Sequence, residues 1–207
     1  MNSINFSQMI KDYDPIMYRG YVSQKLFELL EEYTKTFSKT MVVRFDVTYP
    51  KNFMAVEDNS DMSTLMKLLI QQCLRNGVSP AYFFVREQSR GSDNQHYHCM
   101  LLLDGNKTCR YYPYIELAEK IWGRILGVNP KGLIHYCDRD PDGNRQANGI
   151  ILRSDAPYYE DKIDTVVRQA MYMAKVHTKG IYNDGFRDFG MTRISSIPLL
   201  RKKFRGN

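Results

Sequence analysis

The stretch Gln95–Leu103, with the sequence QHYHCMLLL, decides the fold and places the first candidate site. Its alternating and then continuously apolar side chains predict a strand. Because successive side chains of a strand point to opposite faces, His96 and His98 share one face. The other face, which is expected to lie against a core, carries Tyr97, Cys99, Leu101 and Leu103. Two neighbouring imidazoles supply half of a divalent-metal site, although an exposed histidine pair on an amphipathic strand is the alternative for this motif alone.

A second strand is predicted over Ala81–Gln88, and the turn-rich segment Ser89–Gln95 would join it to His96–Leu103 as a hairpin. A register that pairs Glu87 with His98 would bring a carboxylate to the face that carries both imidazoles. A slip of one residue would remove the carboxylate from that face.

The three side chains of Glu87, His96 and His98 would then form a metal site with open positions for water or substrate. This ligand set suits Mg²⁺, Mn²⁺ or Zn²⁺, so the residues alone do not name the ion. An exposed Glu87 paired with Arg86 or Arg90 is the alternative.

The remaining segments predict an α+β fold in a single domain of residues 1–207. Helical spacing of apolar residues indicates helices over 20–36, from Ser60 or Asp61 to Gly77, Pro113–Gly127 and Asp161–Lys175. A half-buried strand over 43–50, closed by Pro50, and a second hairpin of Gly132–Cys137 with Gly149–Arg153 complete the set. We expect a central antiparallel sheet with helices packed on one face and the active site on the other.

Tyr172 is the candidate nucleophile. It lies opposite the apolar stripe of the helix predicted over Asp161–Lys175, so the core does not require it. Lys175 follows three positions later, close enough for its ammonium group to share a phosphate with the Tyr172 hydroxyl. Because tyrosine is a poor nucleophile at its free pKa of about 10, a cation and a polarised electrophile would have to assist it. An ordinary surface tyrosine is the alternative, since the chain has 15 tyrosines.

Composition limits the classes of function. The 207 residues are too few for a nuclease joined to a helicase motor, and the net charge of +6 suits a polyanionic partner. The basic C-terminal tail comprises residues 195–207, and its run Arg201–Arg205 is expected to be flexible and to add non-specific affinity for phosphates. The four cysteines show no CxxC spacing, and neither a signal peptide nor a membrane span is recognisable, which favours a cytoplasmic protein.

Three segments in order resemble the motifs of the HUH (His-hydrophobe-His) endonucleases. They are Phe45–Pro50, then Glu87 with His96–His98, then Tyr172–Lys175, and the resemblance covers residues of about 40–180. Within that superfamily the chain looks most like the replication initiators of inovirus-type phages and enterobacterial prophages. Two features depart from the pattern. The residue between the histidines is a tyrosine, and the last motif holds one tyrosine, which does not support a mechanism with two tyrosines in one subunit.

The resemblance implies a rolling-circle initiator that nicks and rejoins single-stranded or melted origin DNA. Glu87, His96 and His98 would hold a divalent ion, Mg²⁺ or Mn²⁺, while Tyr172 attacks phosphorus and Lys175 neutralises charge. The product would be a 5′-phosphotyrosine bond and a free 3′-hydroxyl. A host helicase and polymerase in the bacterial cytoplasm are the implied partners. The alternatives are a single-tyrosine transposase or relaxase, and a catalytically silent origin-binding protein.

Several further residues leave two interpretations open. His135 is expected to be a core or capping histidine, and Trp122 a core residue. Asp46 either looks toward the site or pairs with Arg44 or Lys51. His177 is either a phosphate contact or a solvated residue at a helix end. Aromatic side chains that could stack on bases or belong to the core are Tyr49, Tyr82 and Phe84.

Overall fold

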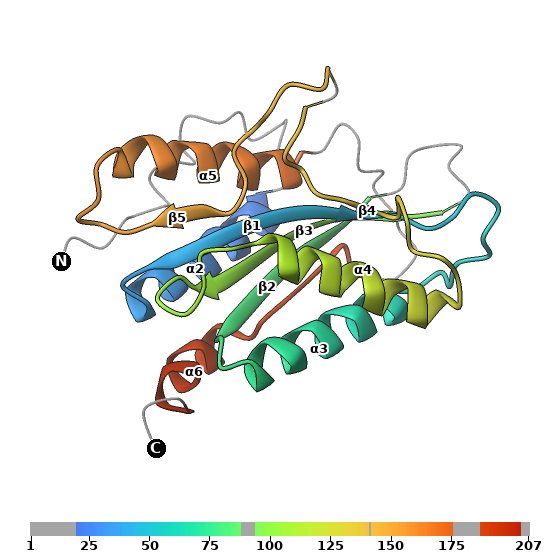
Figure 1. Ribbon diagram of the computed structural model, residues 1–207, viewed down its shortest axis with the longest axis horizontal. Helices are drawn as coiled ribbons and strands as arrows, with labels where there is room; N and C mark the ends of the chain where they lie inside the picture. Colours follow the sequence, from blue (N-terminus) through green and yellow to red (C-terminus); the bar gives the residue numbers. More distant parts are fainter. Residues whose placement is uncertain (1–19, 88–93, 141, 176–186, 204–207) are drawn as a thin grey trace.

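The computed structural model describes residues 20–87, 94–140, 142–175 and 187–203, and Figure 1 shows their arrangement. His177, Arg90 and most of the predicted hairpin tip lie outside these residues. The described helices are α2 (Gly20–Thr36), α3 (Ser60–Arg75), α4 (Tyr112–Leu126), α5 (Tyr159–Met173) and α6 (Ile197–Lys203). The described strands are β1 (Thr40–Val47), β2 (Pro80–Glu87), β3 (His96–Asp104), β4 (Ile134–His135), β5 (Ile150–Leu152) and β6 (Phe189–Met191). The predicted α+β class and the hairpin of β2 with β3 are confirmed.

The strands form one antiparallel sheet with the order β4-β1-β3-β2-β6, and β5 also pairs with β1. The prediction of a second hairpin is therefore wrong, because β4 and β5 bind separate parts of the same β1 edge. Between them the Asn148 side chain accepts a hydrogen bond from the Arg44 backbone N–H (2.8 Å) and donates one to its carbonyl (2.7 Å). Two short strands and one side-chain amide thus provide hydrogen-bond partners for the backbone along the outer edge of β1.

Helices cover both faces of the sheet, so the expectation of helices on one face only is wrong. In Figure 1, α3 and α4 lie in front of the sheet and α2 lies behind it. The cause is that neighbouring residues of the central strands are all apolar, as in Met41–Val43 and Met100–Leu103. Strands of this kind are buried on both faces rather than one. Strand β1 is accordingly buried on both sides, not half-buried as the alternation suggested.

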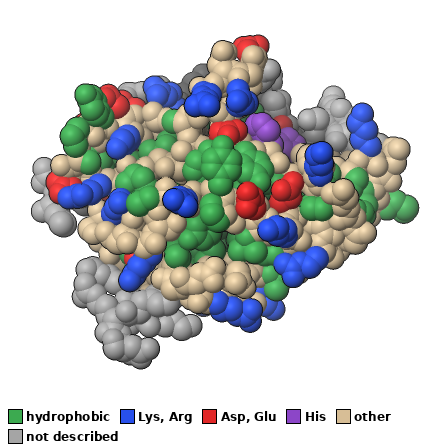
Figure 2. Space-filling model, in the orientation of Figure 1, with side chains coloured by type: hydrophobic (Ala, Val, Ile, Leu, Met, Phe, Trp, Pro, Cys, Tyr) green, Lys and Arg blue, Asp and Glu red, His purple; other side chains and the backbone are tan. Residues whose placement is uncertain are grey.

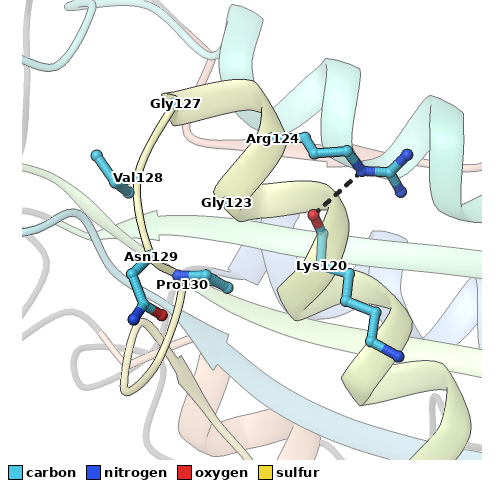
Figure 3. A pocket seen from close by; sticks show the side chains of 7 residues that line it. All are labelled: Lys120, Gly123, Arg124, Gly127, Val128, Asn129 and Pro130. Carbon is cyan, nitrogen blue, oxygen red and sulfur yellow. Dashed lines mark hydrogen bonds between the residues drawn. The ribbon is translucent and has the colours of Figure 1, made fainter.

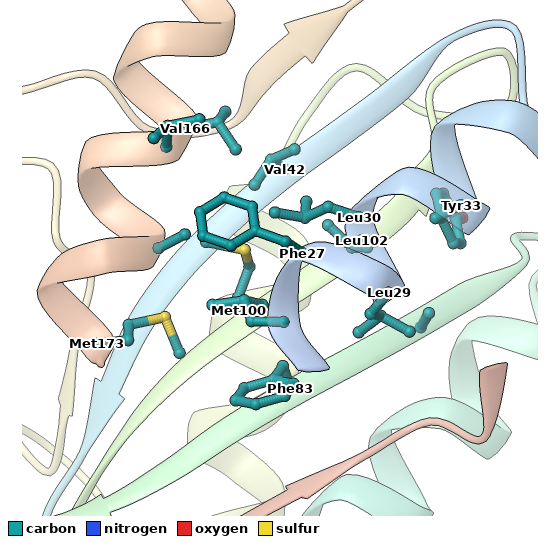
Figure 4. Close-up of a cluster of buried hydrophobic side chains, with 14 of the residues drawn as sticks. Phe27, Leu29, Leu30, Tyr33, Val42, Phe83, Met100, Leu102, Val166 and Met173 are labelled. Atoms are coloured by element: carbon teal, nitrogen blue, oxygen red, sulfur yellow. The ribbon is translucent and has the colours of Figure 1, made fainter. Parts of the chain in front are cut away.

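Each face has its own core. Figure 4 shows the core behind the sheet, where Phe27, Leu30 and Val166 from α2 and α5 meet Val42 and Met100. The core in front packs α3 and α4 on the odd-numbered residues of β1 and β3, including Tyr97, which confirms the predicted inward orientation of that side chain. Trp122 is buried there as expected, and its indole N–H donates a hydrogen bond to the Thr48 carbonyl (2.8 Å).

The predicted helix ends at the chain's glycines agree with the structure. Helix α4 stops at Gly127, which has a φ of 67° and donates its N–H to the Gly123 carbonyl. The expectation that Arg201–Arg205 is flexible is wrong for residues 201–203, because they belong to α6, whose first residue, Ile197, is fully buried behind the sheet. None of the described helices is both long enough and apolar enough to span a membrane.

Candidate metal centre and nucleophile

The candidate metal ligands come from the paired ends of β2 and β3. Glu87 lies opposite His96, and Val85 lies opposite His98, so the predicted pairing of Glu87 with His98 is wrong by two residues. Because side chains alternate with a period of two, this shift keeps Glu87, His96 and His98 on one face. That face is the one that α2 and α5 also cover, so the site lies beside these helices rather than on a face without helices.

The three side chains converge on one point. Glu87 Oε2 lies 2.6 Å from Nε2 of His98 and 3.6 Å from Nε2 of His96. The two imidazole rings meet edge to face at 4.6 Å. Glu87 and His98 are only 4% and 3% exposed, whereas His96 is half-buried. Three potential ligand atoms therefore lie within 4.8 Å of one another.

Asp46 completes the surroundings of His98 from the other neighbouring strand. It lies opposite His98 in the β1–β3 register, and its Oδ1 is 2.8 Å from His98 Nδ1. Burial acts to raise the pKa of Asp46, but the hydrogen bond from His98 and the positive charges of His98, Arg44 and His96 outweigh it and hold the pKa below its usual value. An ionised Asp46 accepts a hydrogen bond from the Nδ1–H of His98, and Nε2 of the same ring then faces Glu87.

Tyr172 lies over this cluster from the last turn of α5. Its ring meets that of His98 edge to face at 5.4 Å. The side chain is 44% exposed, which confirms that the core does not require it. Among the described residues, its hydroxyl has no hydrogen-bond partner. The structure thus brings the predicted nucleophile and the predicted ligands together in one place.

Two cations flank the Tyr172 ring. The Arg44 guanidinium carbon lies 4.3 Å from the ring centroid and Lys175 Nζ lies 5.4 Å from it. Lys175 follows the end of α5 rather than lying within it, and its N–H donates to the Tyr172 carbonyl (3.3 Å). Arg44 Nε is buried and has no hydrogen-bond partner within the part of the chain that the structure describes, and its Nη2 lies 3.7 Å from Asp46.

Arg44 and Asp46 are the parts of the site that sequence reasoning left unresolved. Both are polar residues at even positions of β1, the parity that faces α5. That alternation was the available signal. It did not reveal which neighbouring strand would lie next to β1, and so it did not reveal that His98 would be the partner of Asp46.

The family model of the YagK/YfjJ C-terminal domain matches residues 3–192. The chain belongs to this family. No curated protein matches the sequence. Among solved structures, the N-terminal nuclease domain of non-structural protein 1 from minute virus of mice aligns over 87% of this chain and 81% of its own, with 11% identity and a TM-score of 0.27.

A polar hollow of about 330 Å³ lies next to the site of this YagK/YfjJ domain. Asn148, which binds the Arg44 backbone, is one of its walls. Gln169, three residues before Tyr172 on α5, donates a hydrogen bond to the Ala147 carbonyl in the same wall (2.7 Å). The other lining residues are Tyr111, Tyr112, Asp138, Arg139, Arg145 and Gln146.

A larger hollow of about 670 Å³ lies at the end of α4, on the side of the sheet away from His98 (Figure 3). Lys120 and Arg124 are its charged residues, and no carboxylate, histidine or cysteine lines it. It therefore offers no ligand set for a metal ion.

The structure also places four other side chains for which the sequence left two interpretations open. His135 is exposed, so it is not a core histidine. Tyr49 and Phe84 are buried on the α3–α4 face, away from His98, and Tyr82 packs against the same core. These aromatic side chains belong to the core rather than to a surface that stacks on bases.

Proposed function

We propose that this YagK/YfjJ domain is a metal-dependent DNA nickase and strand transferase that initiates rolling-circle replication through Tyr172. The observation that carries the proposal is the contact of the Tyr172 ring with His98, 5.4 Å between centroids, beside a Glu87–His96–His98 cluster. Neither feature is required by the fold: Tyr172 is 44% exposed, and a buried carboxylate beside two imidazoles costs desolvation energy.

The three converging side chains fit a divalent ion. Glu87, His96 and His98 would hold it, with positions left for water or a phosphate oxygen. Asp46 would act as the partner that orients His98 and raises its basicity, as carboxylates behind metal-bound histidines do. A bound Mg²⁺ or Mn²⁺ would supply polarisation of the scissile phosphate. One carboxylate and two imidazoles, with oxygen ligands from water or phosphate at the remaining positions, accommodate either ion.

The chemical step assigned to Tyr172 is an in-line displacement at phosphorus. Its Oη loses a proton and forms a bond to phosphorus, while the bond from phosphorus to the 3′-oxygen breaks and that oxygen gains a proton. The products are a 5′-phosphotyrosine and a 3′-hydroxyl. Arg44 and Lys175, both close to the ring, are placed to neutralise charge on the tyrosinate and on the phosphoryl oxygens. The reverse reaction with another 3′-hydroxyl would rejoin the strand.

The neighbouring hollow suits a single strand that extends from the nucleophile. Tyr112 contacts the rings of Tyr111 at 4.4 Å and Tyr136 at 5.6 Å and is still about half exposed, so part of this aromatic cluster is accessible to a base. Arg139 and Arg145 line the same hollow and can reach phosphates. Figure 2 shows that the Lys and Arg side chains on the face it presents are spread out rather than gathered, so strand binding would depend on such local groups.

The test is to incubate the full chain with single-stranded DNA that carries the origin of its replicon, in Mg²⁺ or Mn²⁺. We expect a protein–DNA adduct that survives denaturant and disappears with excess chelator. Sequence-specific DNA binding without an adduct would favour a silent origin-binding protein instead. Equal cleavage of unrelated oligonucleotides at many positions would argue against an initiator, because phosphate contacts alone carry no sequence information.

A further inference from the structure

A second group of metal-binding atoms lies on the outer side of β1. Asp46 is opposite His135 in the β1–β4 register, and Cys137 follows two residues after His135. One potential ligand atom from each of these three residues lies within 4.8 Å of the others. This group belongs to a different strand pair from the Glu87–His96–His98 cluster, and none of its three members is needed there as a direct ligand.

The separation of the soft donors matches a tetrahedral zinc site. Cys137 Sγ lies 3.4 Å from His135 Nδ1. A Zn–S bond of about 2.3 Å and a Zn–N bond of about 2.0 Å, at a tetrahedral angle, would separate the two atoms by about 3.5 Å. The pair therefore needs almost no movement to accept an ion.

Access and charge also favour a ligand at this place. His135 is exposed, whereas Cys137 is buried, so an ion can enter from solvent on the His135 side and reach the thiol. Asp46 pairs with His98 through Oδ1 and also faces the Cys137 thiol, and its Oδ2 lies 3.7 Å from Nη2 of Arg44. That separation is too long for a strong hydrogen bond, so Oδ2 keeps capacity to bind a cation.

We infer that Asp46, His135 and Cys137 bind a soft divalent ion of the Zn²⁺ class, with the fourth position open to water. Binding converts the Cys137 thiol to a metal thiolate and releases its proton to solvent. Mg²⁺ and Mn²⁺, which prefer oxygen ligands, do not compete effectively for the thiolate. The thiolate makes this second site selective against Mg²⁺ and Mn²⁺, and Asp46 joins the two sites because its other oxygen holds His98.

The test uses Co²⁺ as a spectroscopic substitute for Zn²⁺ and the full chain without DNA. We expect a thiolate-to-cobalt charge-transfer band that excess Zn²⁺ removes and that excess Mg²⁺ leaves in place. His135→Ala changes an exposed side chain and should abolish the band with the fold intact. Cys137→Ser should do the same.

Two control variants identify the origin of the band. His96→Ala alters only the other cluster and should keep the band. Among the described cysteines, Cys109 is the exposed one. Cys109→Ala removes this thiol and should also leave the band unchanged. The inference is overturned if wild-type protein gives no thiolate band, if the band persists in folded His135→Ala, or if Cys109→Ala removes it.

Discussion

Asp46 Oδ1 on β1 accepts a hydrogen bond from Nδ1 of His98 on β3 at 2.8 Å, and this contact fixes the plane of the imidazole. On the other side of the ring, Glu87 on β2 lies 2.6 Å from Nε2. Three adjacent strands thus contribute one side chain each to a row across the sheet. Because the backbone ladder holds these strands in register, the row is as rigid as the sheet itself.

Replacing Asp46 with Asn keeps the size of the side chain and removes its charge. We expect Mn²⁺ affinity at the Glu87–His96–His98 cluster to fall about 10–100-fold, because the carboxylate behind a metal-bound histidine raises its basicity. Titration calorimetry with Mn²⁺ measures the change. Asp155→Asn, which alters an exposed carboxylate paired with Arg153, is the control and should leave the affinity unchanged. Equal affinity in both variants would mean that Asp46 does not support the site.

Replacing Arg44 with Met should slow adduct formation about 100-fold, since a fixed cation at a site of developing charge has an effect of this order. Lys175→Met should have a smaller effect, because its Nζ lies farther from the Tyr172 ring, 5.4 Å against 4.3 Å for Arg44. Single-turnover rates with saturating DNA separate this effect from binding. Lys51→Met, at an exposed residue just after β1, is the matched control. A normal rate in Arg44→Met would exclude Arg44 from the reaction.

The sequence was sufficient for the positions of α2, α3, α4 and α5 and for which residues of a strand share a face, because both follow from the period of the apolar residues. It was not sufficient for the pairing. Period two specifies that Glu87 and His98 share a face, but the long connection between β2 and β3 leaves the register free to move by two residues. Between β4 and β5, the Asn148 side chain binds the backbone of β1, and no local sequence pattern predicts this role.

Burial raises the pKa of the Cys73 thiol on α3 to about 12. In the unfolded chain the thiol ionises from about pH 9, so above that pH the unfolded state loses a proton that the native state keeps. The stabilisation is complete below pH 9 and is lost as the pH rises toward 12. The free energy of unfolding of the wild type should therefore fall by about 1.4 kcal/mol more per pH unit than that of Cys73→Ala in this range. Urea unfolding at several pH values measures it, and Cys109→Ala, at an exposed thiol, should follow the wild type.

Gly149, just before β5, tolerates no side chain. It has a φ of 62°, and a Cβ there would lie 2.3 Å from Cδ1 of Tyr111. Gly149→Ala should lower the free energy of unfolding by about 2–4 kcal/mol, from backbone strain and overpacking together. Gly143→Ala is the control, because its φ is 85° but no atom lies within 4 Å of the added Cβ. It should lose only about 1–2 kcal/mol, the strain alone. Equal losses in the two variants would contradict the close contact with Tyr111.

The assignment of Tyr172 as the nucleophile gives the most direct prediction. Tyr172→Phe removes one hydroxyl that has no hydrogen-bond partner among the described residues, so the free energy of unfolding should change little. The covalent adduct should vanish, because phenylalanine cannot attack phosphorus. Binding of Mn²⁺ and of single-stranded DNA should persist, since neither depends on that oxygen. A loss of metal binding together with the adduct would instead indicate a structural role for the ring against His98.

Tyr158→Phe is the matched control for this variant. Tyr158 lies at the other end of α5 and is 78% exposed, so it is more accessible than Tyr172 yet far along the helix from the cluster. If exposure alone selected the reacting tyrosine, Tyr158 would carry the DNA. If the neighbouring cations and the Glu87–His96–His98 cluster select it, mass spectrometry of the wild-type adduct should place the nucleotide on the peptide Gln169–Lys175, and Tyr158→Phe should react normally. A nucleotide mapped to any tyrosine outside that peptide would overturn the assignment and leave the contact of Tyr172 with His98 as packing alone.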